Sequence, residues 1–211
     1  TGPSCTDGFD LCLTEIGIEQ NHRFIVAAGS PAGEQLLARI PSKPATDEDV
    51  AEQRAVHAEA VQRMGSGLPE ADVAETLRLS ADSSRWDDIA TRCLSCSNCT
   101  MACPTCFCSG IDDSTDLSGT HAERWQSWNS CFMMDHSYIH GGSIRKSASS
   151  RYRQWLTHKL STWIDQFGVS GCIGCGRCIT WCPVGIDIRQ EIEGFTKDMQ
   201  VPVDDQQEAA S

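Results

Sequence analysis

Two dense runs of cysteines constrain this 211-residue chain more than any other feature of its sequence. The first run reads "CLSCSNCTMACP" at positions 93–104, and the second reads "CIGCGRCITWCP" at positions 172–183. Both follow the pattern C-x2-C-x2-C-x3-C-P, so four thiols and a proline recur at the same spacings. The fold must therefore wrap its backbone twice around something that thiols bind.

Metal binding explains this spacing better than disulfides do. The chain has 13 cysteines, an odd number, and eight of them lie in the two runs. Disulfide frameworks spread their cysteines so that distant loops are joined, whereas thiols three residues apart would crowd one another. Because closely spaced free thiols are typical of metal sites in a reducing compartment, we expect a cytoplasmic protein.

The spacing predicts two [4Fe–4S] clusters with crossed ligation. In this pattern the first three cysteines bind one cluster, and the fourth, which precedes proline, binds the other cluster. The predicted ligands of cluster 1 are Cys93, Cys96, Cys99 and Cys182, and those of cluster 2 are Cys172, Cys175, Cys178 and Cys103.

Two other metal sites fit the cysteines less well. Structural zinc sites use two C-x2-C pairs separated by a loop, so a third cysteine at the same spacing has no role there. Cys99, Cys103 and Cys106 have the C-x3-C-x2-C spacing of a radical S-adenosylmethionine cluster. The longer run already uses two of these thiols, and no barrel-like alternation of strands and helices surrounds them.

Five cysteines lie outside the eight: Cys5, Cys12, Cys106, Cys108 and Cys131. Cys106, Cys108 and Cys131 either form part of a third metal site or pack as small apolar side chains beside the clusters. Cys12 alternates with apolar neighbours and is expected in a strand. No histidine arrangement or glycine-rich phosphate loop typical of an active site occurs, so we expect no catalytic residue on this chain.

The charge of the chain excludes some partners. The formal net charge is -12, which argues against nucleic acid or an anionic membrane, and no apolar run is long enough to span a bilayer. A basic stretch nevertheless interrupts the acidic sequence. We expect it to be a solvated helix face, the alternative being a docking surface for an acidic redox partner; it comprises Arg145, Lys146, Arg151, Arg153 and Lys159.

Hydrophobic periodicity predicts a small β-hairpin followed mainly by helices. Alternation in "DLCLTEI" and "RFIVAAG" predicts a hairpin within residues 9–28. Ser30-Pro31 opens a helix that extends to Ile40, and Thr46 with Asp49 resembles a capping box for the next helix. The segment "SGIDDSTDLSGT", residues 109–120, is expected to be a polar loop.

Two further helices are expected around the second cysteine run. One is "SRYRQWLTHKLSTWIDQFG", which Gly168 ends. The other is "IDIRQEIEGFTKDM". The positions expected to face inward are Trp155, Leu156, Leu160, Trp163, Ile164 and Phe167 in the first, and Ile188, Ile192, Phe195 and Met199 in the second.

Several phrases resemble a known family. "WDDIATRCLSCSNCTMACPTCFC", "RYRQWLTHKL" and "CIGCGRCITWCPVGIDI" resemble the iron–sulfur beta subunit of group 3 nickel–iron hydrogenases, the sulfhydrogenase or NAD(P)-linked type. The corresponding iron–sulfur component of anaerobic sulfite reductase shares the pattern. The resemblance is dense over residues 86–190 and implies a mainly α fold, an alpha-helical ferredoxin module preceded by a small α+β segment with the hairpin.

The resemblance also implies a domain division. Family members are longer, so residues 1–43 are expected to be the C-terminal part of an upstream α+β domain. Residues 44–84 would be a helical linker region, residues 85–200 the alpha-helical dicluster ferredoxin domain, and residues 201–211 an acidic tail.

By this likeness the chain would relay electrons between a flavin-containing NAD(P)H-oxidoreductase subunit and a nickel–iron hydrogenase small subunit. Two alternatives stay open: the electron-transfer subunit of an anaerobic sulfite reductase, or a structural iron–sulfur module that binds a partner. One cluster is enough to staple a small fold, so two clusters favour the relay.

Overall fold

The computed structural model describes residues 4–18, 21–65, 67–69 and 71–200. The chain divides into two compact units, Thr1–Gly67 and Leu68–Ser211. The predicted acidic tail, residues 201–211, lies outside the described residues, and the domain limits expected from the sequence stay a prediction.

The first unit contains the predicted hairpin, which is confirmed. Strands β1 (Leu11–Ile16) and β2 (Arg23–Ala28) pair antiparallel, and Cys12 lies in β1 as expected. Helix α1 (Pro31–Leu37) follows, and its N-cap Ser30 accepts a hydrogen bond from the backbone N–H of Gly33. This helix ends before Ile40, three residues earlier than predicted.

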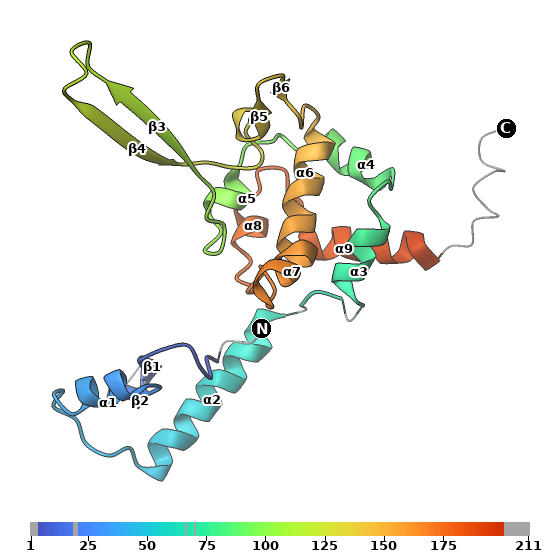
Figure 1. The fold of residues 1–211 in the computed structure, drawn as a ribbon. Coiled ribbons are helices and arrows are strands. Elements are labelled where there is room, and N and C mark those ends of the chain that lie inside the picture. The colour runs from blue at the N-terminus through green and yellow to red at the C-terminus, as the bar shows by residue number, and fades with distance from the viewer. Residues whose placement is uncertain (1–3, 19–20, 66, 70, 201–211) are drawn as a thin grey trace. The chain divides into compact units, whose positions relative to one another are not determined.

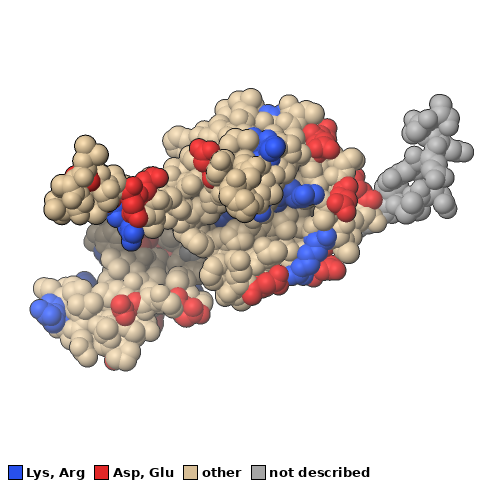
Figure 2. Space-filling model, turned by 45° about the horizontal axis from the view of Figure 1, so that its top comes forward, with Lys and Arg blue, Asp and Glu red and all other residues tan. Residues whose placement is uncertain are grey.

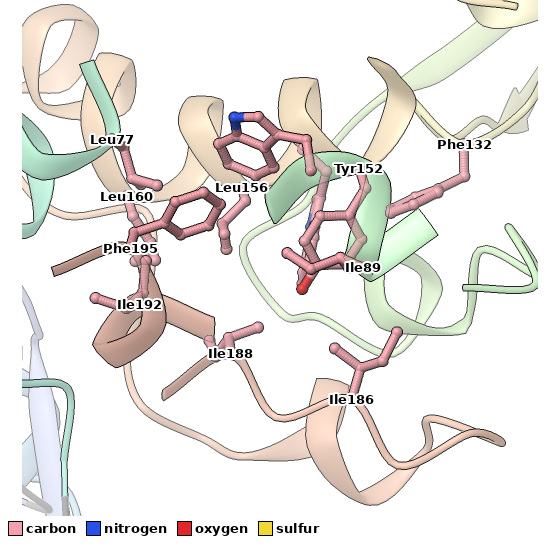
Figure 3. Close-up of a cluster of buried hydrophobic side chains, with 12 residues drawn as sticks. Leu77, Ile89, Phe132, Tyr152, Leu156, Leu160, Ile186, Ile188, Ile192 and Phe195 are labelled. Atoms are coloured by element: carbon pink, nitrogen blue, oxygen red, sulfur yellow. The ribbon is translucent and has the colours of Figure 1, made fainter. Parts of the chain in front are cut away.

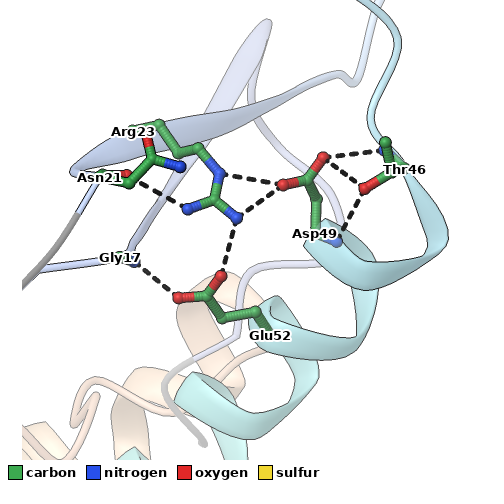
Figure 4. A network of polar contacts seen from close by, with 6 residues as sticks. All are labelled: Gly17, Asn21, Arg23, Thr46, Asp49 and Glu52. Carbon is green, nitrogen blue, oxygen red and sulfur yellow. Dashed lines mark hydrogen bonds and ion pairs between the residues drawn. The ribbon is translucent and has the colours of Figure 1, made fainter.

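Helix α2 (Asp47–Met64) is fixed to the hairpin by a polar network (Figure 4). The capping box between Thr46 and Asp49 is present as predicted. Arg23 of β2 donates from Nη2 to Asp49 Oδ1 at 2.7 Å and to Glu52 Oε2 at 2.9 Å. The backbone N–H of Thr46 and the Arg23 guanidinium lower the pKa of Asp49 to about 2. The carboxylate therefore joins helix and hairpin in its charged form.

The second unit is built around a core that helices α3 (Val73–Leu79), α4 (Arg85–Arg92), α6 (Ala148–Thr157) and α9 (Ile188–Gln200) share (Figure 1). Figure 3 shows the labelled side chains of these helices converging. The core consists of Leu77, Trp86, Ile89, Phe132, Tyr152, Trp155, Leu156, Leu160, Ile186, Ile188, Ile192 and Phe195.

The long helix predicted at 150–168 contains a π-helical turn. Helix α6 continues into the π turn η2 (His158–Thr162) and then into α7 (Trp163–Phe167), which Gly168 ends with φ 71°. Most of the predicted inward face is buried, but Ile164 and Phe167 are 39% and 52% exposed. Met199 of α9, also expected to face inward, is 46% exposed. Each of these three lies at or near a helix end, where the core no longer covers the side chain.

Two arginines fasten α4 to α9 across the core. Arg85 Nε donates to Asp198 Oδ2 at 2.7 Å, and Arg92 Nη2 donates to Glu191 Oε1 at 2.9 Å. The Glu191 side chain is only 6% exposed, so loss of Arg92 would leave a buried acidic group without its ion-pair partner. Helix α4 leads directly into the first cysteine run, and α9 follows the second. The ion pairs between α4 and α9 therefore help to fix the position of one run relative to the other.

The segment predicted as a polar loop is a β-hairpin, and that prediction was wrong. Strand β3 (Ser109–Thr115) pairs antiparallel with β4 (Ala122–Trp128), and the hairpin extends away from the helices (Figure 1). Both of its faces are largely exposed, so the sequence lacks the apolar alternation that marks a half-buried strand. Backbone pairing and the Arg124–Asp113 ion pair, at 2.7 Å, form it instead.

The remaining elements are short. Helices α5 (Asn98–Met101) and α8 (Arg177–Thr180) are single turns inside the cysteine runs, and β5 (Tyr138–Ile139) pairs with β6 (Gly142–Ser143) after the 3₁₀ turn η1 (Asp135–Ser137). The fold is thus mainly α with small hairpins. Among the described residues, no helix has both the length and the apolar character needed to cross a membrane.

Candidate metal centre

The two cysteine runs follow the same local backbone path. Ser95 and Gly174 stand two residues after the first cysteine of their runs and have φ of 51° and 73°. Ser97 and Gly176 precede the single-turn helices and have φ of 67° and 71°. This left-handed conformation costs a serine about 1–2 kcal/mol and a glycine almost nothing. The first run adopts it in spite of that cost, which indicates that the path itself is required.

Backbone amides in both runs point toward cysteine sulfur. The N–H of Ser95 lies 3.5 Å from Cys93 Sγ, and the N–H of Gly174 lies 3.4 Å from Cys172 Sγ. Amide donors of this kind stabilise thiolates, because a hydrogen bond to the charged form favours it. The repeated spacing in the sequence thus corresponds to a repeated local backbone geometry in the structure.

Cys182, from the second run, lies beside the first run. One pocket is lined by Cys93, Cys96, Cys99 and Cys182, and Cys178 of the second predicted set lines it as well. Burial raises the pKa of Cys93, and the charges of Cys182 and Cys96 add to this effect. The structure thus brings together all four cysteines of the first predicted ligand set.

Cys103, from the first run, lies correspondingly near the second run. Burial, followed in order of effect by the charges of Cys172, Cys103 and Cys175, raises the pKa of Cys178 to about 11. Within the described chain, no group of three or more His, Cys, Asp or Glu side chains is arranged to hold a single metal ion.

The thiols differ in how readily they lose a proton. Burial raises the pKa of Cys99 far above its usual value. A hydrogen bond with Cys106 and another with the Thr105 hydroxyl lower the pKa of Cys103 to about 4, although burial opposes them. Iron binds thiolates, so occupation of the first pocket must displace protons from Cys93 and Cys99, whereas Cys103 already favours its charged form.

Two buried donors without protein partners line the first pocket. The Tyr152 hydroxyl and the Trp155 indole Nε1 have no hydrogen-bond partner in the described part of the chain, and their side chains are 2% and 4% exposed. Burial raises the pKa of Tyr152 well above its usual value, so the hydroxyl keeps its proton. Unpaired buried donors are costly, and a sulfide-bearing cluster in this pocket would supply the missing acceptors. The residues present therefore fit an iron–sulfur cluster.

The three cysteines of the predicted third site also come together. Cys106, Cys108 and Cys131 line one pocket with His136 and His158. Cys106 and Cys131 also pack against the hydrophobic core, as the packing interpretation requires. Cys5 and Cys12 belong to the other unit, Thr1–Gly67.

Sequence reasoning did not place four side chains beside the cysteines, although it correctly expected Trp155 to face inward; the four are Tyr152, Trp155, Arg151 and Lys159. The expectation that the basic stretch forms a solvated face was wrong for Arg151 and Lys159, which are 8% and 3% exposed. Their positions carried a signal. Arg151 precedes Trp155 by four residues and Lys159 follows it by four, so both lie on the apolar stripe of the helix.

Comparison with known proteins gives three findings. Residues 92–186 match the family described as 4Fe–4S dicluster domain. Over 184 residues, 86% of this chain, the sequence is 30% identical to sulfhydrogenase 2 subunit beta of Pyrococcus furiosus, and the chain spans 53% of that protein's length. No solved structure matches the chain. Residues 92–186 are thus similar to 4Fe–4S dicluster domains, and the chain is similar to a sulfhydrogenase beta subunit.

Proposed function

We propose that this chain is an electron-transfer subunit that binds two [4Fe–4S] clusters by crossed ligation. One ligand set is Cys93, Cys96, Cys99 and Cys182, and the other is Cys172, Cys175, Cys178 and Cys103. The observation that carries the proposal is the placement of Cys182 beside the first run, in a pocket that also contains two unpaired buried donors. If all four cysteines of each run bound the same cluster, Cys182 would be expected beside the second run and not beside the first.

When bound, each cluster supplies one-electron redox chemistry, and the polypeptide supplies position and environment. The exchange of Cys103 and Cys182 ties both ligand sets to the same short piece of fold. Helices α5 and α8, one inside each run, pack against each other, which keeps the two sites close. Phe132, Tyr152 and Ile186 contribute apolar surface to the lining of the first pocket. These features favour a relay over a structural staple.

The proposed partners rest on the likeness to a hydrogenase subunit. Because that protein is the beta subunit of a sulfhydrogenase, we propose that this chain transfers electrons between a flavin-containing NAD(P)H-oxidoreductase subunit and a nickel–iron hydrogenase small subunit in the cytoplasm. Groups of both charge signs are interspersed on the face in Figure 2. This arrangement and the net charge of -12 favour protein partners over nucleic acid or an anionic membrane.

The first test is an anaerobic preparation of the full chain. We expect about eight irons per chain, reversible reduction by dithionite, and paramagnetic resonance signals from reduced clusters. Clusters that are present but resist reduction would support the structural alternative. Fewer than about eight irons, or zinc in their place, would overturn the proposal.

The second test identifies the client complex. The chain is affinity-purified from its source, and the subunits that accompany it are analysed for metals and cofactors. Nickel and flavin support the hydrogenase assignment. Siroheme without nickel assigns the chain to a sulfite reductase instead.

A further inference from the structure

Two buried cations lie on the helix that separates the cysteine runs. Arg151 of α6 is 8% exposed and Lys159 of η2 is 3% exposed. Neither forms an ion pair with a carboxylate of the described residues, although the chain has 29 acidic residues against 17 basic ones. Removing an unpaired charge from water is expensive. Burial of two such charges on one helix therefore calls for compensating negative charge.

Lys159 lies between the segments that supply Cys103 and Cys172, two members of one proposed ligand set. Its Nζ donates to Thr105 Oγ1 at 2.8 Å and to the carbonyl oxygen of Gly171 at 3.0 Å. The same Thr105 hydroxyl lies 3.2 Å from Cys103 Sγ. One hydroxyl thus connects the ammonium group to a cysteine sulfur, and the residue before Cys172 provides the second anchor.

The π turn brings this contact about. The N–H of Gly171 donates to the backbone carbonyl of Lys159 at 3.1 Å, so the second cysteine run begins against η2. A Cβ at Gly171 would lie 2.6 Å from that carbonyl oxygen and 2.6 Å from the Trp163 ring, so only glycine permits the approach. Single π turns inside α-helices occur often at functional sites.

Arg151 makes a matching contact with the other ligand set. Its Nη2 donates to Ser95 Oγ at 3.2 Å, and the backbone N–H of Ser95 lies 3.5 Å from Cys93 Sγ. Its Nη1 donates to the carbonyl oxygens of Arg145 and Lys146, and its buried Nε has no partner among the described residues. Each cation therefore reaches a hydroxyl-bearing residue beside a cysteine of a different set.

We propose that Lys159 and Arg151 are the built-in counter-charges of the two clusters, Lys159 for the cluster of Cys103 and Arg151 for the cluster of Cys93, and that each raises the reduction potential of its own cluster. The inference rests on the proposed function. Reduction adds one electron, and hence one negative charge, with no bond made or broken and no proton taken up. A fixed cation in a poorly solvated site stabilises that added charge.

The spacing of the two residues makes their effects separable. Eight helical positions correspond to about 12 Å along the axis, and the Coulomb energy falls with distance. Each cation therefore acts mainly on the nearer cluster. If the two side chains had a purely structural role, substitution of each one would not selectively shift the reduction potential of the nearer cluster.

The test is a redox titration of the full chain, followed by paramagnetic resonance and visible absorbance. In Lys159→Met we expect reduction of one cluster to become about tenfold less favourable, a shift of about 59 mV to lower potential for a one-electron couple. The other cluster keeps its potential. Arg151→Met shifts the other cluster, and the charge-preserving controls Lys159→Arg and Arg151→Lys leave both potentials near the wild-type values.

Iron content distinguishes failure of the proposed function from failure of the counter-charge proposal. If the wild-type chain binds no iron–sulfur cluster, the proposed function fails. If Lys159→Met and Arg151→Met keep about eight irons and both potentials stay unchanged, the counter-charge proposal is overturned. Should Lys159→Met not assemble, Lys159→Gln decides the matter, because it retains hydrogen-bond donors to Thr105 and Gly171 without the charge. An unshifted potential in Lys159→Gln also contradicts the proposal.

Discussion

Tyr152 has a hydroxyl that is fully desolvated and, within the described chain, without a hydrogen-bond partner. If that hydroxyl donates to a cluster in the first pocket, we expect Tyr152→Phe to retain iron and to lower the potential of one cluster. The expected loss is about 1 kcal/mol, the usual contribution of one hydrogen bond. Redox titration measures it.

A matched control exists in Tyr138, which is 63% exposed and outside the pocket. Tyr138→Phe should leave both potentials unchanged. If Tyr152→Phe also leaves both potentials unchanged and raises the free energy of unfolding, the hydroxyl does not donate a hydrogen bond to a cluster. The gain in stability would then come from removal of a buried donor that has no acceptor.

Crossed ligation is testable with pairs of cysteine substitutions. If Cys93 and Cys182 bind the same cluster, the double variant Cys93→Ala/Cys182→Ala loses that cluster and keeps about four irons. The variant Cys93→Ala/Cys103→Ala should then lose both clusters. Iron analysis of anaerobic preparations distinguishes the outcomes, since ligation within each run predicts the reverse pattern.

At the level of single side chains, some roles could be predicted from the sequence and others could not. The spacing of the eight cysteines predicts two ligand sets, because such spacing is a property of the cofactor as much as of the fold. The burial of Arg151 and Lys159 was missed because a charged residue is ordinarily expected in water. Their place on the apolar stripe outweighs their charge, and only the tertiary contacts with Ser95 and Thr105 show why.

The two longer hairpins differ in what made them predictable. In β1–β2 one face is partly covered, so apolar and polar residues alternate and the strands can be recognised. In β3–β4 the residues of both faces are mostly polar, and cross-strand pairs such as Asp113–Arg124 replace a buried face. Such a strand has the composition of a loop. The π turn in the long helix was equally invisible, because the apolar periodicity continues through it.

The attachment of α2 to the first hairpin should depend on pH. The pKa of Asp49 is about 2 in the folded chain and about 3.8 without its partners. A lowered pKa contributes stability that is complete above the higher value and lost as the pH falls through the lower one. We therefore expect protection of the first turn of α2 to decline between about pH 4 and pH 2.

Hydrogen exchange at residues 47–50 measures this decline. In Asp49→Asn the pH dependence in that window should flatten, because the titrating group is gone. A carboxyl titration of Asp49 with a midpoint near 4 in the wild-type chain would contradict the prediction.

For the whole molecule, the iron content per chain distinguishes two clusters from three. Cys106, Cys108 and Cys131 line a common pocket, and the third metal site stays a prediction. We expect the triple variant Cys106→Ser/Cys108→Ser/Cys131→Ser to retain about eight irons if these thiols only pack beside the core. A wild-type content of about twelve irons that falls to about eight in the variant would establish a third cluster.

The β3–β4 hairpin leaves the helical body with no buried side chain along either strand. Its connecting residues 116–121 are exposed as well. An affinity tag or a spin label placed there would sit apart from every cysteine of the two ligand sets. The hairpin tip therefore offers a handle through which the intact assembly can be captured and the approach of its neighbours measured, without disturbing the metal chemistry.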